Sequence, residues 1–381
     1  MKLLHIADLH IGKRVNGFNM LEEQEYILGQ ILHIIDTNKP DGLLIAGDVY
    51  DKSQPSTEAV ELLDSFLTEL AGRLPVFMIS GNHDSPERLG FCSRIMQKTG
   101  LYIAGVFSGS IQMVPMKDRH GTVNIYMLPY LKPAIVRPYF DQDIETYEDA
   151  VRAVLSAAPI YTGQRNILLA HQFVTWGTHQ PLRSESESIS VGGTDNVDVS
   201  VFDAFDYVAL GHLHGPQAIG RDTVRYSGSP LKYSFSEVHH NKAATLLEMG
   251  PKGEIDIRAI PLTPRRDMRR IKGPIARLLA AGREDKASAE NYIHATVTDE
   301  EEIYDAIGML RQVYPNLMVL DFENSRSRRS GSFLSSAPQD ASLKSPVEMF
   351  SEFYSIQNNA RLTPEQLAVI ERVFSKAVGK T

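Results

Sequence analysis

Aspartate, asparagine and histidine residues follow five separate apolar runs of this chain. The runs cover residues 2–7, 42–47, 76–80, 167–170 and 207–211. Carboxylate, amide and imidazole groups bind divalent metal ions, and histidine also transfers protons near neutral pH. A metal-dependent hydrolase is therefore the first expectation. The residues that would carry this chemistry are, in chain order, Asp8, His10, Asp48, Asn82, His83, Asp84, His171, His212 and His214.

The types of these residues limit the metal. They offer oxygen and nitrogen atoms, and the chain has only one cysteine, Cys92. Such a set suits Mn²⁺, Fe or Zn²⁺ better than Mg²⁺ or Ca²⁺, which prefer oxygen ligands alone. We expect Asp48 to bridge two ions about 3.5–4 Å apart, which would lower the pKa of a bound water and hold the oxygens of a phosphorus centre. Asn82 would keep the cluster less anionic, so that a phosphate can approach.

Two spacings bear on the orientation of these side chains. Asp8 and His10 are two residues apart, as are His212 and His214, so in extended backbone both members of a pair point to the same side. His83 lies beside Asn82 and need not be a ligand. With Asp84 next to it, His83 could be oriented as a general acid for the leaving oxygen.

The elements that would position these residues form a layered α/β pattern. The five runs are rich in Val, Ile and Leu, which is typical of buried strands. Helical periodicity separates them at residues 21–35 and 60–70. In an open α/β sheet, ligands bind beyond the carboxyl ends of the strands, so one site is expected there. Short strands at 224–226, 244–248 and 255–260 are expected to complete a second sheet.

A new unit is expected after a basic run at residues 265–272. The pattern there predicts a strand at 292–297, a helix at 299–313 and a strand at 317–322. Residues 324–346 are rich in Ser, Arg and Pro, which is typical of a linker. Residues 347–378 show helical periodicity in two pieces, and the first piece is unusually aromatic. Such a helix docks on a partner or on its own domain.

Composition sets further bounds. The chain has 381 residues, too many for one typical core, and its net charge is −8. That charge does not exclude DNA, because acidic residues cluster at 141–149 and 299–302 while the run at 265–272 is basic. A solvated surface explains the basic run equally well. Without a membrane-spanning run, a basic leader or a disulfide framework, a cytoplasmic protein is expected.

Histidines outside the five positions are expected to be structural. His5 and His33 are examples, since a lone histidine is more often a satisfied structural residue than a ligand. Each of the five positions would be weak evidence alone. Their common placement after an apolar run is what favours a functional site.

With these residues in view, the chain resembles the calcineurin-like metallophosphoesterases. The resemblance rests on residues 8–12, 47–48, 81–84, 171 and 211–214. Residues 191–195, 228–235 and 345–354 are similar to segments of the bacterial Mre-type double-strand-break repair nucleases. The resemblance implies an α/β fold, a four-layer β-sandwich flanked by helices, with a small α+β capping domain and a C-terminal helical tail. The implied ranges are 1–269 for the nuclease domain, 270–324 for the DNA-binding capping domain, 325–346 for a linker and 347–381 for an ATPase-docking segment.

The resemblance also implies roles for the site residues. One metal would be held by Asp8, His10, Asp48 and His214, and the other by Asp48, Asn82, His171 and His212. His83 would be the catalytic histidine, supported by Asp84. The two ions would be Mn²⁺. The implied partners are DNA and a coiled-coil ATPase of the SMC type, with a homodimer inside a heterotetramer.

The leading expectation is therefore a Mn²⁺-dependent DNA nuclease acting with an ATPase in DNA end processing, repair, recombination and replication. It would act as a 3'-5' double-strand exonuclease and a single-strand or hairpin endonuclease. The alternative is a phosphomonoesterase or a small-nucleotide phosphodiesterase, because the same two ions serve monoesters and diesters. A non-catalytic adaptor is a third reading, disfavoured by the complete ligand set and by the His83–Asp84 pair.

Overall fold

The computed structural model describes residues 1–187, 195–325, 345, 347–351, 354 and 362–378. The chain divides into two compact units, Met1–Asp267 and Met268–Thr381. Two predicted features, the linker at 325–346 and the similarity at 191–195, lie almost wholly outside the described residues. Much of the first helical piece of the tail does as well.

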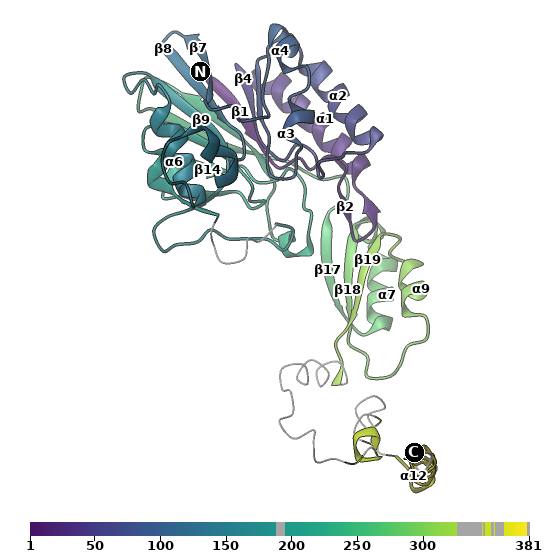
Figure 1. The fold of residues 1–381 in the computed structure, drawn as a ribbon. Helices are drawn as coiled ribbons and strands as arrows, with labels where there is room; N and C mark the ends of the chain where they lie inside the picture. The colour runs from purple at the N-terminus through teal and green to yellow at the C-terminus, as the bar shows by residue number, and fades with distance from the viewer. Residues whose placement is uncertain (188–194, 326–344, 346, 352–353, 355–361, 379–381) are drawn as a thin grey trace. The chain divides into compact units, whose positions relative to one another are not determined.

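The first unit contains a six-stranded sheet built mostly from the first third of the chain. Strands β1, β4, β5 and β6 are parallel, and β15 and β16 add antiparallel strands beside β1. Both connecting helices, α1 (Leu21–Asn38) and α2 (Thr57–Leu70), lie on one face of the sheet (Figure 1), as right-handed crossovers in one direction require. The strands in spatial order are β16 (Ile255–Pro261), β15 (Ala243–Met249), β1 (Lys2–Ile6), β4 (Gly42–Ala46), β5 (Val76–Ile79) and β6 (Leu101–Ala104).

A second six-stranded sheet belongs to the same unit. Its four inner strands are parallel, and both of its edge strands pair antiparallel. Helix α6 (Tyr147–Ala157) connects two of these strands and begins at a capping box formed by Thr146 and Asp149. In spatial order the strands are β13 (Gln217–Ile219), β14 (Arg221–Tyr226), β12 (Tyr207–Gly211), β9 (Arg165–His171), β8 (Gly121–Leu128) and β7 (Gln112–Asp118).

The two sheets share a hydrophobic core. Leu44 and Phe77 of the first sheet belong to the same buried cluster as Ile125 and Leu169 of the second, and all four side chains are fully buried. Side chains alternate along a strand, so neighbours such as Leu43 point to the opposite face of the first sheet. The inner strands of each sheet, such as β4, β9 and β12, are thus buried on both faces, which explains the continuous apolar runs in the sequence.

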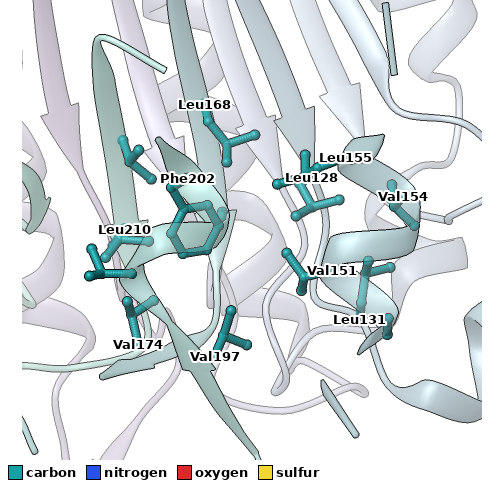
Figure 2. Packing of buried hydrophobic residues seen from close by; sticks show 14 of the residues in the cluster. Leu128, Leu131, Val151, Val154, Leu155, Leu168, Val174, Val197, Phe202 and Leu210 are labelled. Atoms are coloured by element: carbon teal, nitrogen blue, oxygen red, sulfur yellow. The ribbon is translucent and has the colours of Figure 1, made fainter. Parts of the chain in front are cut away.

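Figure 2 shows the packing on the outer face of the second sheet. Val151 and Val154 of α6 and Phe202 join the same buried cluster as Leu168 and Leu210 of the sheet. The helices, the two sheets and the opposite helices make four layers. This confirms the predicted α/β sandwich.

Shorter elements connect these layers. The β-strands are β2 (Arg14–Val15), β3 (Phe18–Asn19), β10 (Phe173–Thr175) and β11 (Asn196–Asp198), and the short α-helices are α3 (Pro86–Leu89), α4 (Ser93–Met96) and α5 (Pro133–Val136). Single 3-10 turns lie at Gln97–Thr99, Arg137–Tyr139, Val199–Phe202 and Phe235–Glu237.

Two expectations about the sheets were wrong. The five ligand-bearing runs do form strands, but β1, β4 and β5 belong to one sheet and β9 and β12 to the other, so no single open sheet carries the site. The three late strands do not complete a second sheet together. Strand β14 joins the second sheet, whereas β15 and β16 extend the first, where β15 covers the edge of β1.

The second unit, taken by itself, has a parallel three-stranded sheet in the order β17 (Met268–Gly273), β18 (Tyr292–Val297) and β19 (Leu317–Phe322). Helices α7 (Ile275–Glu284), α8 (Lys286–Ala289) and α9 (Ala306–Arg311) accompany it. Strands β18 and β19 match the predicted ranges. Part of the predicted basic run is itself the strand β17.

The helix predicted at 299–313 is shorter than expected. Asp299 accepts a hydrogen bond from the backbone N–H of Ile275 at 2.7 Å, so it caps α7 instead of starting its own helix. Asp305 has a left-handed backbone and accepts from the N–H of Gly308 at 3.1 Å, which makes it the N-cap of α9.

The second helical piece of the tail is present as α12 (Pro364–Val378). The rings of Phe350 and Phe374 are 6.2 Å apart, so the two parts of the tail contact each other. Among the residues described, no helix is both long and apolar enough to cross a bilayer.

Candidate metal centre

The strand ends of the two sheets meet at the predicted residues. The ring Nδ1 of His171, at the end of β9, lies 2.8 Å from the carbonyl oxygen of Ala46 at the end of β4. The backbone N–H of His212 donates to Asp8 at 2.9 Å, which joins the ends of β12 and β1. A Cβ atom at Gly211 would lie 1.9 Å from the Ala46 oxygen, so only glycine permits this approach. One edge of the sandwich thus collects residues from both sheets.

The backbone at this edge is not extended. The φ angles of Asp8, His10 and Asp48 are 54°, 46° and 46°, and that of His212 is 109°. Left-handed backbone is costly for residues other than glycine and concentrates at functional sites. The expectation of extended backbone was therefore wrong for both pairs, because the chain leaves the extended conformation where each strand ends.

Asp48 lies at the centre of the cluster. Its Oδ2 is 3.4 Å from Nε2 of His171 and 3.7 Å from Nε2 of His10. Its Oδ1 accepts the backbone N–H of His83 at 2.8 Å, which fixes the rotation of the carboxylate. One oxygen of Asp48 thus faces two histidines that come from different strand ends, as a bridging carboxylate would.

Asn82 holds the side of the cluster near β9 and β12. Its Oδ1 is 3.0 Å from Nε2 of His171 and 2.9 Å from Nδ1 of His212. Because Nδ1 of His171 donates to Ala46, Nε2 of a neutral ring carries a lone pair that points toward an oxygen. A cation bound between Nε2 of His171 and Oδ1 of Asn82 would remove the repulsion between the lone pairs of these two atoms.

His10 and His214 form the other side. Their Nε2 atoms are 3.1 Å apart. Two nitrogens bound to one metal at about 2.0–2.1 Å would be about 2.9–3.4 Å apart. The ring of Tyr233 packs against both histidines, with centroids at 5.6 and 5.9 Å, and its hydroxyl donates to the carbonyl of Leu9. The similarity at residues 228–235 therefore includes a wall of this site.

Buried polar atoms without partners support a fit to metal ions. Among the described residues, Oδ2 of Asp8 and Nδ1 of His10 are buried without a hydrogen bond. Two groups of candidate ligands, His10–Asp48–His83 and Asp8–Asp48–His171, each have ligand atoms within 4.8 Å of one another. Asp48 belongs to both groups. The donors are nitrogen and oxygen atoms, so the residues suit two divalent cations.

Burial and charge act strongly on these groups. Burial raises the pKa of Asp8 well above its usual range, and the neighbouring carboxylate of Asp48 adds to the effect. Burial alone would lower the pKa of His171, but Asp48 and then Asp8 outweigh it and raise the pKa to about 9. Burial lowers the pKa of His212 to about 3. Burial alone would raise the pKa of Asp48, but the neighbouring histidines, His171 first, outweigh it and hold that pKa well below its usual range. Without a cation the site thus holds one carboxylate that is expensive to ionise, Asp8, and an ionised Asp48 paired with a protonated His171.

His83 is held differently from the expectation. Its Nδ1 lies 2.8 Å from the carbonyl oxygen of Asp51, which orients the ring. The carboxylate of Asp84 instead accepts the backbone N–H groups of Val49, Tyr50 and Gly81, at 3.1, 2.9 and 2.8 Å. Burial, with the nearby Asp48 charge, raises the pKa of Asp84 to about 6. Asp84 thus ties the loop after β4 to the loop after β5.

A cavity of about 570 Å³ opens beside His83 and Asn82. Its other walls are polar and include Asp51, Lys52 and Gln54. The cluster is therefore buried but reachable, as a site acting on an external substrate must be.

The histidine His5, expected to be structural, has two partners in the core. It bonds to the hydroxyl of Tyr207 at 3.0 Å and to the carbonyl of Leu210 at 3.2 Å. Two residues near His214, Ser186 and Glu237, were not singled out from the sequence. Neither follows an apolar run or sits in a recognisable spacing, so no signal marks them.

The comparisons with known proteins agree with this geometry. The model of the calcineurin-like phosphoesterase family matches residues 1–216, and the model described as "Type 5 capsule protein repressor C-terminal domain" matches residues 264–358. The chain belongs to the calcineurin-like phosphoesterase family. A curated relative from Staphylococcus epidermidis is SbcD, one of the subunits of the nuclease SbcCD. It is 36% identical over 326 residues, covering 84% of this chain and 85% of the relative. This confirms the predicted similarity to the bacterial Mre-type nucleases.

Two solved structures are also similar. A dimetal phosphatase from Danio rerio is 12% identical, with a TM-score of 0.43, over 69% of this chain and 96% of that chain. A phosphoesterase from E. coli, Yfce, is 13% identical, with a TM-score of 0.28, over 69% of this chain and 100% of that chain.

Proposed function

We propose that this protein is a Mn²⁺-dependent DNA nuclease that works with an SbcC-type ATPase in DNA end processing, repair and recombination. One observation carries the proposal: ligands from both sheets converge on a single oxygen of Asp48. The relative that belongs to a nuclease supports DNA as the substrate, since it aligns over most of both chains. We propose both activities expected above, exonuclease on double strands and endonuclease on single strands and hairpins, in the cytoplasm.

The roles proposed for the ligands follow the two sides of the cluster. Two bound divalent ions would supply a water of lowered pKa and stabilise charge on the phosphate oxygens. The facing Nε2 atoms of His10 and His214 support one site, and the oxygen of Asn82 between two histidines supports the other. The proposed sets are Asp8, His10, Asp48 and His214 for one ion, and Asp48, Asn82, His171 and His212 for the other.

We propose that His83 protonates the leaving oxygen. The Nδ1–H of a neutral ring is committed to the carbonyl of Asp51, so proton exchange with substrate takes place at Nε2. His83 also lines the open cavity, where a phosphodiester can reach it. Asp84 acts through the backbone, because it holds Gly81 and Val49 in place around Asp48.

The test compares two substrates. Purified protein with Mn²⁺ should cleave linear or hairpin DNA faster than it hydrolyses p-nitrophenyl phosphate. His83→Ala should abolish DNA cleavage while both ions remain bound, as measured by elemental analysis. Strong monoester hydrolysis without DNA cleavage would instead establish a phosphomonoesterase. Loss of metal in His83→Ala would show that His83 is a ligand.

The second unit supplies the proposed contacts with DNA and ATPase. Arg269 and Arg270 on β17 have exposed side chains, which suits contacts with a phosphate backbone. We propose residues 270–324 as the capping domain, 325–346 as a linker and 347–381 as the segment that docks on the ATPase. Val369 and Val373 of α12 are 53% and 56% exposed, so this helix has apolar surface to bury. Deleting residues 347–381 should abolish ATPase binding in a pull-down and spare cleavage of simple DNA; undiminished binding would refute the docking role.

A homodimer is also proposed, inside a heterotetramer with the ATPase. Phe91 and Ile95, around α4, are 75% and 67% exposed. Large apolar side chains this exposed on neighbouring residues are typical of interfaces. Phe91→Ser with Ile95→Ser should shift the mass measured by light scattering from dimer to monomer. A dimer of unchanged stability would place the interface elsewhere.

A further inference from the structure

A buried ion pair lies directly behind His214. The side chain of Glu237 is fully buried, and that of Lys242 is 2% exposed. The Nζ atom of Lys242 is 2.6 Å from Oε2 of Glu237 and also donates to the carbonyl of His214 and to Ser229, both at 2.8 Å. Burying such a pair is weak evidence for stability, since well-packed apolar side chains would often serve as well. The position of the Glu237–Lys242 pair, directly behind His214, instead indicates a role in orienting that histidine.

The donors and acceptors in the hydrogen bonds that join Glu237, Ser186 and the His214 ring can be assigned in only one way. An ionised carboxylate accepts but cannot donate, and a serine hydroxyl has one proton. The Oγ of Ser186 is 2.6 Å from Oε1 of Glu237, so its proton goes to the carboxylate. The same Oγ is 2.8 Å from Nδ1 of His214 and therefore accepts from it, while Oε1 of Glu237 lies 3.2 Å from that nitrogen. Both of these acceptors, Oγ of Ser186 and Oε1 of Glu237, thus require a proton on Nδ1.

We propose that Glu237, through Ser186, is a positioning residue for metal binding: it keeps the proton of His214 on Nδ1 and leaves Nε2 free to bind a divalent cation. The inference rests on the proposed two-metal site. Nε2 is the atom that faces His10 at 3.1 Å, so the tautomer decides whether this side of the site offers two nitrogen lone pairs or one. Carboxylates that orient a ligating histidine in this way raise metal affinity in other proteins.

The backbone of His214 is held by the same chain segment. Glu187 accepts the N–H of His214 at 2.8 Å with one oxygen and the N–H of Ser184 at 3.0 Å with the other. The neighbouring N–H of Glu185 donates to Ser236 at 3.0 Å, one residue before Glu237. Residues 184–187 and 234–242 therefore hold His214 at its ring and at its backbone, which fixes both the tautomer and the direction of Nε2.

The experiment measures Mn²⁺ affinity by calorimetry on the full chain. The double variant Glu237→Leu with Lys242→Met removes the acceptor without leaving a lone buried charge. We expect one of the two ions to bind about 10–100-fold more weakly. Cleavage of DNA should fall at limiting Mn²⁺ and recover when Mn²⁺ is raised. Ser186→Ala, at a partly buried position, should weaken binding of the same ion to a smaller extent.

A control removes another ion pair, in which Arg165 is buried and Asp118 is partly buried. Asp118→Leu with Arg165→Met deletes such a pair elsewhere in the first unit and should leave Mn²⁺ affinity unchanged. If the Glu237 and Lys242 double variant binds Mn²⁺ as the wild type does, the pair is only structural and the inference fails. If that variant does not fold, Ser186→Ala decides between the two possibilities. An unchanged Mn²⁺ affinity in Ser186→Ala would refute the proposal that Glu237 acts on His214 through Ser186. Failure of the wild type to bind two ions or to cleave DNA would instead refute the proposed function.

Discussion

Gly81→Ala is the sharpest single test of the arrangement around Asp48. A Cβ atom at Gly81 would lie 2.2 Å from Oδ1 of Asp48 and 2.3 Å from its backbone nitrogen. The φ angle of Gly81 is one that other residues adopt readily, so the substitution causes no backbone strain of its own. Any effect therefore comes from the collision with Asp48.

The size of the effect follows from these distances. Real Cβ atoms essentially never come closer than 3.0 Å to another atom, and the contact with the backbone nitrogen of Asp48 would be 2.3 Å. The loop after β5 and the loop after β4 must therefore separate by about 3.0 − 2.3 = 0.7 Å. A misplacement of about 1 Å in a catalytic group costs about 100-fold in rate. We expect the single-turnover rate constant for Mn²⁺-dependent DNA cleavage to fall about 100-fold, with a cost of about 1–3 kcal/mol in the free energy of unfolding.

The assay is single-turnover cleavage of linear DNA with saturating Mn²⁺, together with thermal melting. Gly163→Ala is the matched control, because its Cβ meets no atom within 4 Å and its φ angle is also ordinary. The control should cleave DNA at the wild-type rate. A folded Gly81→Ala protein that also cleaves at the wild-type rate would show that the position of Asp48 does not limit the chemistry.

Three further predictions concern stability. Arg165 is buried and bonds to Asp118, which holds the pKa of that carboxyl well below its usual range. Asp118→Asn should lower the free energy of urea unfolding by about 1.5–3 kcal/mol at neutral pH, since Asp118 is only partly buried. The pair contributes fully above the unfolded pKa of about 4, so the two proteins should begin to converge below that pH and become equal only below the depressed pKa of folded Asp118. Burial lowers the pKa of His5 to about 3, so between pH 6.5 and 3 only the unfolded chain takes up its proton. Stability should therefore fall by about 1.4 kcal/mol per pH unit on acidification, and His5→Gln should remove that slope in a urea titration. Chelation should lower the melting temperature and added Mn²⁺ should restore it, and an unchanged melting curve would contradict a buried site for cations.

The sequence predicted the elements of the site well because one rule connects apolar runs to strand ends. The run before Asp48 and the run before His171 read alike, since both strands are buried on both faces. For the same reason the sequence cannot assign them to different sheets: a strand between two layers has the same composition in either sheet. That the five strand ends meet could therefore be predicted from the sequence. That they come from two different sheets could not.

Other details depend on contacts distant in sequence. Asp299 and Asp305 both look like helix-starting residues, and only the fold shows that one caps α7 and the other caps α9. Glu237 looks like a surface residue in a polar loop until Lys242 and His214 are placed around it. Contacts of this kind produce no recognisable spacing in the sequence, because the residues that contact each other lie in separate loops.

The unfavourable features of the site have a common origin. Left-handed backbone at Asp8, His10 and Asp48 costs of order 1–3 kcal/mol each, and the buried carboxylate of Asp8 has one oxygen without a partner among the described residues. Strands that ended in turns without left-handed residues would avoid this strain. Their last side chains would then point away from one another and would not meet at one site. The strained turns are what bring donors from two sheets to one oxygen of Asp48. Divalent cations bound there would compensate both costs at once, by pairing the buried charges and by holding the strand ends together.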